Sequence, residues 1–141
     1  MKVLIIKNDG FGDVIVSLPL LTSIYHKKYE NLELDIVLSK VNSDLKFYLK
    51  NFKNIYFLES LGSKFNPKKK ISEIDKKILK KIKKKKYDIC FVMRRNLNYE
   101  NLMIMQAVNA KQKYTCTENF IKNKNLINLL DKTTPHWINI N

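Results

Sequence analysis

The first 21 residues constrain the fold more than any other stretch. Residues 3–6 are a short apolar run rich in β-branched side chains, which is typical of a strand buried on both faces. A turn rich in Asn, Asp and Gly follows at residues 8–12, and from Val14 onward the apolar residues take helical spacing. The order strand, glycine-containing loop, helix is the opening unit of a doubly wound α/β fold.

The rest of the chain repeats this alternation of elements. We expect strands at residues 32–38, 54–58, 87–93 and 112–117, and helices at 14–28, 42–49, from Ser72 through the lysine run, and at 97–110. The order predicts a single Rossmann-like domain with a parallel sheet of about five strands and right-handed crossovers. Residues 3–7 should form its central strand, between 34–38 and 87–93. We assign residues 1–117 to the domain and 118–141 to a polar tail or linker.

The balance of charge is strongly basic. The chain has 27 Lys and Arg against 13 Asp and Glu, a formal net charge of +14, and Arg94 and Arg95 are its only arginines. Such a field attracts anions, so nucleic acid, an anionic lipid surface and a phosphorylated glycolipid are candidate partners. Lysines at 76–86 alternate with isoleucines at helical spacing, which favours the solvated face of an amphipathic helix over a lipid contact.

Smaller patterns set further expectations. Ser72 followed by Asp75 predicts a variant of the capping box at the start of the lysine-rich helix. Pro19 should kink the first helix or mark the first turn of its main part. Cys90 lies in an apolar run and should be a buried small hydrophobe, and neither it nor Cys116 belongs to a metal-binding pair. No apolar run is long enough for a spanning helix or a signal peptide, which predicts a cytoplasmic protein.

Candidate functional residues gather where the first and fourth strands end. Asp13 lies at the junction of loop and helix, where a helix N-terminus favours a carboxylate and where open α/β sheets place their ligands. It could act as a general base or simply cap the turn. Lys7 could meet an acidic or phosphorylated group, although a solvated lysine is the simpler interpretation. Arg94 and Arg95 could contact a carboxylate or phosphate.

The glycines of the first loop fit two interpretations. Gly10 and Gly12 permit positive φ or close approach of a ligand, and they equally fit a plain tight turn. They do not complete the dinucleotide-binding fingerprint G-x-G-x-x-G, because Ile15 stands at the third glycine position. Dinucleotide binding is therefore poorly supported.

The opening residues also resemble a known family. Ile5-Ile6-Lys7, Gly12-Asp13-Val14 and Leu18-Pro19-Leu20 are similar in order and spacing to the N-terminal signature of glycosyltransferase family 9, the heptosyltransferase-like enzymes of GT-B fold. The usual serine-containing loop is replaced by residues 9–11. Residues 86–88, 109–112 and 135–137 resemble later segments of the family's N-terminal domain. The resemblance implies that this chain corresponds to that domain only, without the domain that binds the donor nucleotide.

The resemblance implies a reaction and a set of partners. Asp13 would be the base in inverting transfer of a heptose from ADP-heptose to the lipopolysaccharide inner core, with no metal or other cofactor. Lys7, Gly10, Gly12, Arg94 and Arg95 would contact a lipid A-type core acceptor. The chain would be cytoplasmic or peripheral on the inner membrane, incomplete and inactive alone, and could work with a separate C-terminal-domain chain.

Two alternatives stay open. A non-catalytic Rossmann-like remnant would keep the fold without sugar transfer. A basic module that binds nucleic acid or other anions is suggested only by charge. The sequence has no RNP-like aromatic strand, zinc finger or helix-turn-helix pattern, so we do not expect nucleic acid as a partner.

Overall fold

The structure is a computed structural model that describes residues 1–23, 31–61, 70–94 and 99–115. Its elements in chain order are β1 (Lys2–Lys7), α1 (Phe11–Ser23), β2 (Glu33–Ser39), the 3₁₀ helix η1 (Lys40–Tyr48), β3 (Asn54–Leu58), α2 (Glu73–Lys84), β4 (Tyr87–Val92), α3 (Tyr99–Ala107) and β5 (Ala110–Thr115). Every strand pairing is parallel, in the order β3-β2-β1-β4-β5. The predicted Rossmann-like parallel sheet of five strands is confirmed.

The central place of β1 is also confirmed. Ile5 pairs with Ile36 of β2 on one side and with Phe91 of β4 on the other. The side chains of Leu4, Ile5 and Ile6 are buried. Apolar burial from both faces explains why this strand needs no polar alternation.

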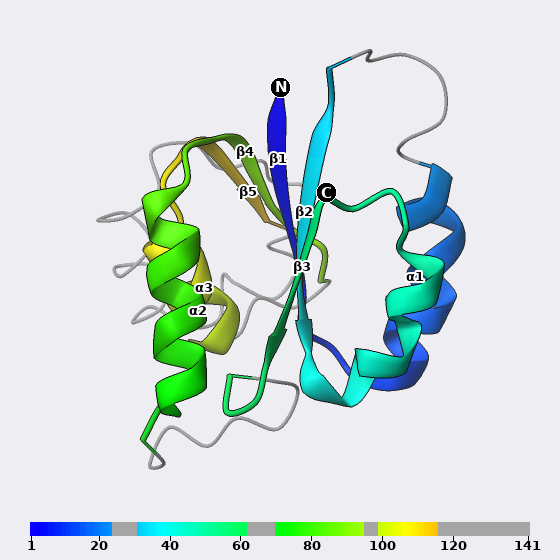
Figure 1. Ribbon diagram of the computed structural model, residues 1–141, viewed down its shortest axis with the longest axis horizontal. Coiled ribbons are helices and arrows are strands. Elements are labelled where there is room, and N and C mark those ends of the chain that lie inside the picture. The colour runs from blue at the N-terminus through cyan, green and yellow to red at the C-terminus, as the bar shows by residue number, and fades with distance from the viewer. Residues whose placement is uncertain (24–30, 62–69, 95–98, 116–141) are drawn as a thin grey trace, which may run out of the picture.

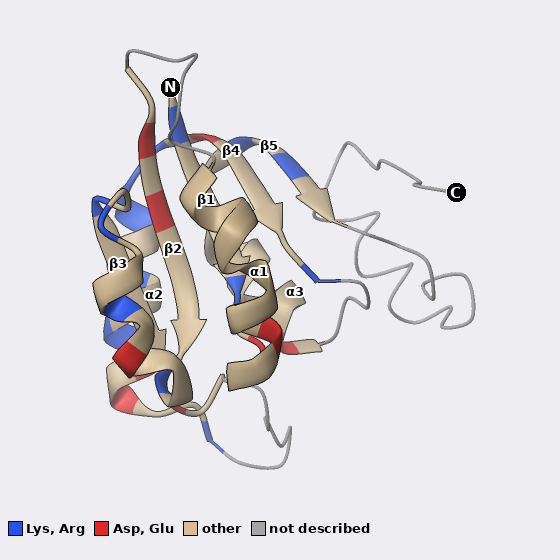
Figure 2. Cartoon of the chain, turned by 90° about the vertical axis from the view of Figure 1, so that its right-hand side faces the viewer, with Lys and Arg blue, Asp and Glu red and all other residues tan. Residues whose placement is uncertain are grey.

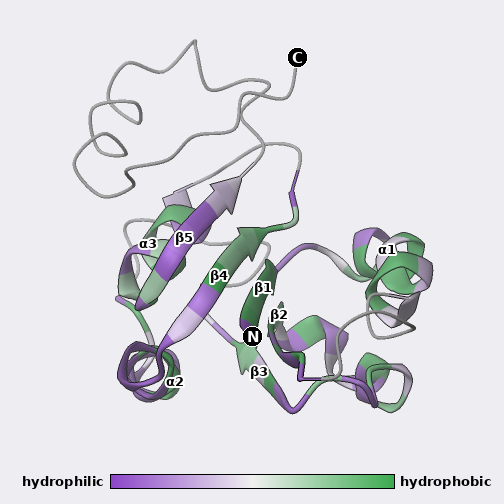
Figure 3. Ribbon diagram, turned by 90° about the horizontal axis from the view of Figure 1, so that it is seen from above, coloured by the Kyte–Doolittle hydropathy of each residue, from purple (hydrophilic) through white to green (hydrophobic). Residues whose placement is uncertain are grey.

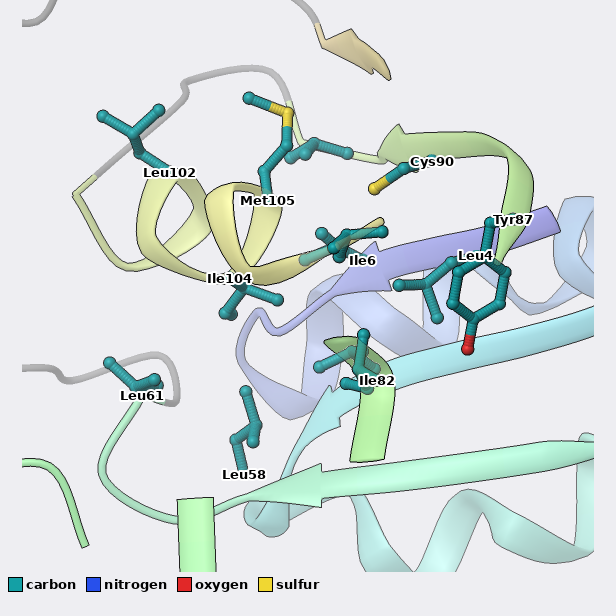
Figure 4. Packing of buried hydrophobic residues seen from close by; sticks show 13 residues of the cluster. Leu4, Ile6, Leu58, Leu61, Ile82, Tyr87, Cys90, Leu102, Ile104 and Met105 are labelled. Atoms are coloured by element: carbon teal, nitrogen blue, oxygen red, sulfur yellow. The ribbon is translucent and has the colours of Figure 1, made fainter. Parts of the chain in front are cut away.

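Two helical layers cover the sheet. Figure 1 shows α1 and the following short helix on one face and α2 with α3 on the other. Ile5 packs with Val14 and Leu21 of α1 and with Leu45 of η1. On the opposite face the packing is made by apolar side chains that include Leu4, Ile6, Ile82, Leu102, Ile104 and Met105 (Figure 4). Each face of β1 thus supports its own core.

The apolar sequence of residues 87–93 predicts a strand that is buried throughout, like β1, and this prediction is wrong. Phe91 is exposed, and Asp88 and Ile89 are only partly buried. Phe91 is in register with Ile5, so its side chain lies on the same sheet face as α1. The described helices on that face, α1 and η1, pack against β1, β2 and β3 and leave this side of β4 open.

Several local expectations can be compared directly. Ser72 caps α2 by accepting from the Asp75 backbone N–H at 3.1 Å, as predicted. The Asp75 carboxylate does not close the capping box. It accepts instead from the backbone N–H groups of Glu59, Ser60 and Leu61, each at 2.8 Å, and so fixes the turn after β3.

Other predictions concern single residues and the chain's last segment. Pro19 lies inside α1, which begins at Phe11, so it does not mark a first turn. Cys90 is fully buried as predicted, and burial raises the pKa of its thiol to about 12. Cys116 and the proposed tail at 118–141 lie outside the described residues. Within the described part of the chain, no helix is both long and apolar enough to cross a bilayer.

Candidate functional site

The candidate site lies at the carboxyl edge of the sheet, where β1 and β4 end and α1 begins. β1 ends at Lys7, and residues 8–10 lead directly into α1. The ladder with β4 extends past its last strand residue, because the Met93 N–H donates to the Ile6 carbonyl at 2.9 Å. This places Arg94 beside the end of β1, in the crevice where open α/β sheets bind ligands.

A buried ionic cluster, which the sequence did not reveal, occupies this edge. Lys7 Nζ lies 2.5 Å from Asp9 Oδ2, and Arg94 Nε lies 3.1 Å from Asp9 Oδ1. The expectation of a solvated Lys7 is therefore wrong: Lys7 is buried, and Asp9 is only 4% exposed. We call Lys7, Asp9 and Arg94 the carboxyl-edge cluster. With two cations and one carboxylate it carries a net charge of +1.

Polar atoms around this cluster are left without partners. The Asn42 amide donates to the Asp9 carbonyl at 2.9 Å, and the Asn8 amide donates to the Leu61 carbonyl at 2.9 Å. Among the residues that the structure describes, the amide oxygens Asn42 Oδ1 and Asn8 Oδ1 are buried without a hydrogen-bond partner, as is Arg94 Nη1. Buried polar groups in native proteins are nearly always satisfied. These atoms therefore offer hydrogen-bonding capacity to a ligand or to water.

Asp13 lies in the first turn of α1 and differs from Asp9 in its surroundings. Its side chain is exposed, and it forms no ion pair with any described residue. A Cβ added to Gly10 would lie 3.6 Å from Asp13 Oδ2, so the carboxylate lies over the backbone of the loop. An exposed carboxylate at a helix N-terminus keeps its lone pairs available to accept a proton or a hydrogen bond.

Of the two interpretations left open for the glycines, positive φ is not what the structure shows. Neither Gly10 nor Gly12 adopts a left-handed φ, and a Cβ on Gly12 would meet nothing within 4 Å. A plain turn followed by the start of a helix explains both positions. Arg95, the remaining candidate, lies outside the described residues.

A second polar cluster lies toward the amino edge of the sheet. Asp35 in β2 accepts from Tyr87 Oη at 2.8 Å, Asn54 Nδ2 at 2.7 Å and Lys85 Nζ at 2.9 Å. We call these four residues the amino-edge cluster. A hollow of about 400 Å³ beside it is lined largely by lysines, including Lys2, Lys53, Lys84, Lys85 and Lys86. Burial and the hydrogen bond to Asp35 raise the pKa of Tyr87 above its usual value.

No metal centre is visible in the part of the chain that the structure describes. There, no group of three or more His, Cys, Asp or Glu side chains is arranged to hold an ion. The polar side chains described at the carboxyl edge are an exposed carboxylate, the cations Lys7 and Arg94, and amide groups.

Solved structures share this arrangement of strands and helices. A glycosyltransferase of family 9 from Veillonella parvula aligns with 99% of this chain at a TM-score of 0.67 and 13% identity. The E. coli heptosyltransferase WaaC aligns with the whole chain at 16% identity, with TM-scores of 0.66 in complex with ADP-2-deoxy-2-fluoro heptose and 0.67 with ADP. The fold is like that of glycosyltransferase family 9.

The similarity to these solved structures covers less than half of each of their chains. The chain spans 36% of the Veillonella protein and 42–43% of WaaC. No protein-family model matches the sequence, and no curated protein matches it significantly. The comparisons therefore establish a glycosyltransferase-like fold for this chain.

Proposed function

We propose that this chain is the acceptor side of an inverting glycosyltransferase of the heptosyltransferase type, with Asp13 as its general base. The observation that carries the proposal is the exposed Asp13 carboxylate at the carboxyl edge of the central strand, which forms no ion pair with any described residue and lies near a cluster with an excess positive charge. The family-9-like fold supports the same reaction class. The acceptor would be the lipopolysaccharide inner core.

The chemistry assigned to Asp13 is a single proton transfer. As the acceptor hydroxyl oxygen attacks the anomeric carbon of the sugar, Asp13 takes the hydroxyl proton. The new C–O bond forms on the face opposite the nucleotide, and the old bond breaks with its electron pair going to the diphosphate. The anomeric configuration inverts. The first turn of α1 holds the carboxylate at the ligand-binding edge, while solvent access lets the base lose its proton afterwards.

The carboxyl-edge cluster would orient the acceptor. Arg94 has a buried N–H group without a partner, and phosphate or carboxylate groups suit a guanidinium. Lys7 is held by Asp9, so we assign it the role of fixing Asp9 and thereby Arg94. Gly10 and Gly12 add no side chains that would block approach to Asp13. Arg95 stays a prediction as an acceptor contact.

Stabilising the departing diphosphate requires a second domain that binds the donor. Charge develops on the diphosphate in the transition state, and stabilising that charge supplies much of the rate enhancement. The solved neighbours are more than twice as long as this chain, and WaaC was solved with ADP and with an ADP-heptose analogue. We propose ADP-heptose as the donor, bound mainly by a further domain, in the same polypeptide or as a separate chain in the cytoplasm.

The proposal can be tested with the isolated chain and with a donor-binding domain added. We expect no ADP release from ADP-heptose with the 141-residue chain alone, and activity once the donor-binding domain is joined or mixed in. In the active assembly, Asp13→Asn should lower kcat by about 10²–10⁴-fold, because the base is lost while the shape is kept.

Two controls separate base loss from structural damage. Asp44→Asn removes another exposed acid on the same sheet face and should leave the rate unchanged. Asp13→Asn itself should change the free energy of unfolding by less than about 1 kcal/mol, the range of a carboxylate at a helix N-terminus. Full activity of Asp13→Asn would refute the role of this residue. A folded assembly that binds acceptor and donor without turnover would favour the non-catalytic remnant.

A further inference from the structure

The hollow beside the amino-edge cluster collects lysines from three separate parts of the chain. Lys2 begins β1, Lys53 directly precedes β3, and Lys84, Lys85 and Lys86 run from the end of α2 into the link to β4. Parallel strands all start at the same edge of a sheet, so the fold brings these distant lysines together. We call this cavity of about 400 Å³ the amino-edge hollow.

The amino-edge hollow has an excess of positive charge. It is lined by five lysines and by two carboxylates, Glu33 and Asp35, which leaves a net charge of +3. Two of the lysines share one carboxylate, because Glu33 Oε2 lies 3.0 Å from Lys53 Nζ and 3.8 Å from Lys2 Nζ. Figure 2 shows the acidic positions of β2 beside basic segments at this edge. Cations that converge on a concave surface concentrate the electric field and attract anions.

Two lysines of the hollow have no counter-ion in the part of the chain that the structure describes. Lys84 and Lys86 are exposed, and neither forms an ion pair with a described residue. The position of Lys84 in the last turn of α2 is explained by the helix dipole, which favours cations there. Lys86, Lys53 and Lys2 lie outside any helix, so the dipole does not explain their convergence.

Hydrogen bonds fix the floor of the hollow. Asp35 is 4% exposed and holds the Lys85 ammonium at 2.9 Å, while the Tyr87 hydroxyl and the Asn54 amide donate to the same carboxylate. Lys85 Nζ also lies 5.5 Å from the centroid of the Tyr56 ring. A cation that is already held in place loses little conformational freedom when a ligand binds, which favours affinity.

The size and lining of the hollow indicate the class of anion that fits. Its volume is that of a small-molecule site. Each exposed ion pair contributes little, so a single phosphate gains little here, whereas a chain of phosphates contacts several lysines at once. Among the described residues that line the hollow, Tyr87 is the only aromatic one, and it is 3% exposed. No ring is therefore offered on which a nucleobase could stack.

We propose that the amino-edge hollow binds a soluble oligophosphate, which it recognises by the phosphate groups. Lys53, Lys84 and Lys86 contact phosphate oxygens, and Lys85 adds a charge that Asp35 holds in place. Free polyphosphate and the triphosphate of a nucleotide are two sources of this chemistry. The hollow lies at the edge of the sheet opposite the carboxyl edge. The bound anion consequently takes no part in the proposed sugar transfer, and the inference does not rest on it.

The test is isothermal titration calorimetry of the full 141-residue chain with sodium tripolyphosphate. We expect binding that weakens as salt rises. The Kd should be at least about tenfold lower than that of inorganic phosphate, because several lysines act together. ATP carries the same triphosphate and should bind within about threefold of tripolyphosphate, since the base has no stacking partner. A Kd for ATP lower by about tenfold, with the same dependence on the lysines of the hollow, would support the site and identify a nucleotide as the source.

Two double variants with the same loss of charge locate the binding. Lys84→Gln/Lys86→Gln removes the two lysines of the hollow without a described counter-ion and should raise the Kd by about tenfold. Lys77→Gln/Lys81→Gln removes two exposed lysines of α2 that do not line the hollow and should raise it less than about threefold. Figure 3 shows α2 as mostly hydrophilic, so lysines there are ordinary solvated residues. Circular dichroism will verify that both variants keep the fold.

A carboxylate variant gives a test of opposite sign. Glu33→Gln raises the net charge of the hollow from +3 to +4 and releases Lys2 and Lys53, so it should lower the Kd by about threefold or more. Glu73→Gln makes the same change of net charge at the other end of α2, where Glu73 pairs with Lys76 at 2.6 Å, and should change the Kd less than about twofold. A gain of affinity cannot result from a damaged fold.

Several results would overturn the proposal. One is unchanged binding by Lys84→Gln/Lys86→Gln, and another is tripolyphosphate that binds no more tightly than inorganic phosphate. Equal losses in the two lysine variants would reassign the binding to the whole lysine surface, which suits the backbone of a nucleic acid.

Arg94→Gln separates the two edges of the sheet. This variant should keep the Kd for tripolyphosphate within about threefold, because Arg94 belongs to the carboxyl-edge cluster. A loss of about tenfold would place the anion at the carboxyl edge and would overturn the proposal. None of these measurements depends on sugar transfer, so the inference and the proposed function fail separately.

Discussion

Two buried aspartates lie near opposite edges of the same sheet, and both are 4% exposed. Asp35, toward the amino edge, is paired with one cation, Lys85, and accepts from neutral donors on Tyr87 and Asn54. Asp9, at the carboxyl edge, is shared by two cations, Lys7 and Arg94. The two aspartates are therefore equally buried, but the cluster around Asp35 is neutral whereas the cluster around Asp9 has a net charge of +1.

The two clusters also differ in whether the buried polar atoms around them have hydrogen-bond partners. The described residues of the amino-edge cluster leave no buried side-chain atom without a hydrogen bond, whereas unpartnered atoms surround the carboxyl-edge cluster. A neutral cluster whose hydrogen bonds are satisfied stabilises the fold. A cluster with excess positive charge and free hydrogen-bonding groups is prepared for an anionic ligand. The comparison separates an aspartate in a neutral, satisfied cluster from one in the cluster that we propose orients the acceptor.

The largest effect is expected from Asp9→Asn. It leaves the buried Lys7 ammonium without its counter-ion, and breaking a buried pair costs about 3–5 kcal/mol of unfolding free energy. Urea denaturation followed by circular dichroism measures this loss. Adding Lys7→Met to the variant should recover more than half of it, because the uncompensated charge is then removed. Failure of the second substitution to recover stability would mean that the pair is not the cause.

Asp35→Ala should cost less, about 2–3 kcal/mol, although Asp35 accepts more hydrogen bonds than Asp9. The reason is that the Lys85 side chain is 40% exposed and can turn to water. The same denaturation experiment applies. Asp88→Ala removes a partly exposed carboxylate that pairs with Lys111 and accepts from the Lys2 backbone N–H, and it serves as control, with an expected loss of about 1 kcal/mol. A larger loss for Asp35→Ala than for Asp9→Asn would reverse the comparison.

Tyr87→Phe deletes one hydrogen bond to Asp35 and should cost about 1 kcal/mol at neutral pH. Burial raises the pKa of Tyr87 in the folded state, so its neutral form is the one that the fold stabilises. That contribution is complete below the unfolded-state pKa of about 10 and is lost as pH rises above it. Unfolding free energies between roughly pH 8 and 11 should fall less steeply for Tyr87→Phe than for the parent. Identical slopes would refute this assignment.

The smallest effect concerns anion binding at the carboxyl edge. Inorganic phosphate should stabilise the parent chain by up to about 1 kcal/mol at concentrations a few times its Kd. Arg94→Gln should remove most of this gain, because its free N–H is lost from the cluster. Lys85→Gln, at the amino edge, should keep it. Thermal unfolding with phosphate against sodium chloride of equal ionic strength makes the measurement, and equal gains in both variants would show that phosphate acts elsewhere.

The sequence by itself determined the fold and the edge of the sheet at which the candidate site lies. The apolar run of β1, the turn after it and the later alternation of strands and helices were sufficient to predict a five-stranded parallel sheet with β1 at its centre. Such patterns suffice because burial on both faces requires continuous apolar runs, and parallel strands require crossover helices. Asp13 could be singled out because its position at a strand–loop–helix junction is a local property of the sequence.

Only the tertiary structure decided what the polar residues do. Asp35 follows the alternation of a half-buried strand, yet Tyr87 and Lys85, about 50 residues later in the chain, bury and satisfy it. Lys7 is indistinguishable from a solvated lysine until Asp9 and Arg94 are placed around it. The charge balance of a buried cluster depends on which strand ends meet, and this depends on the order of strands in the sheet and not on any local pattern.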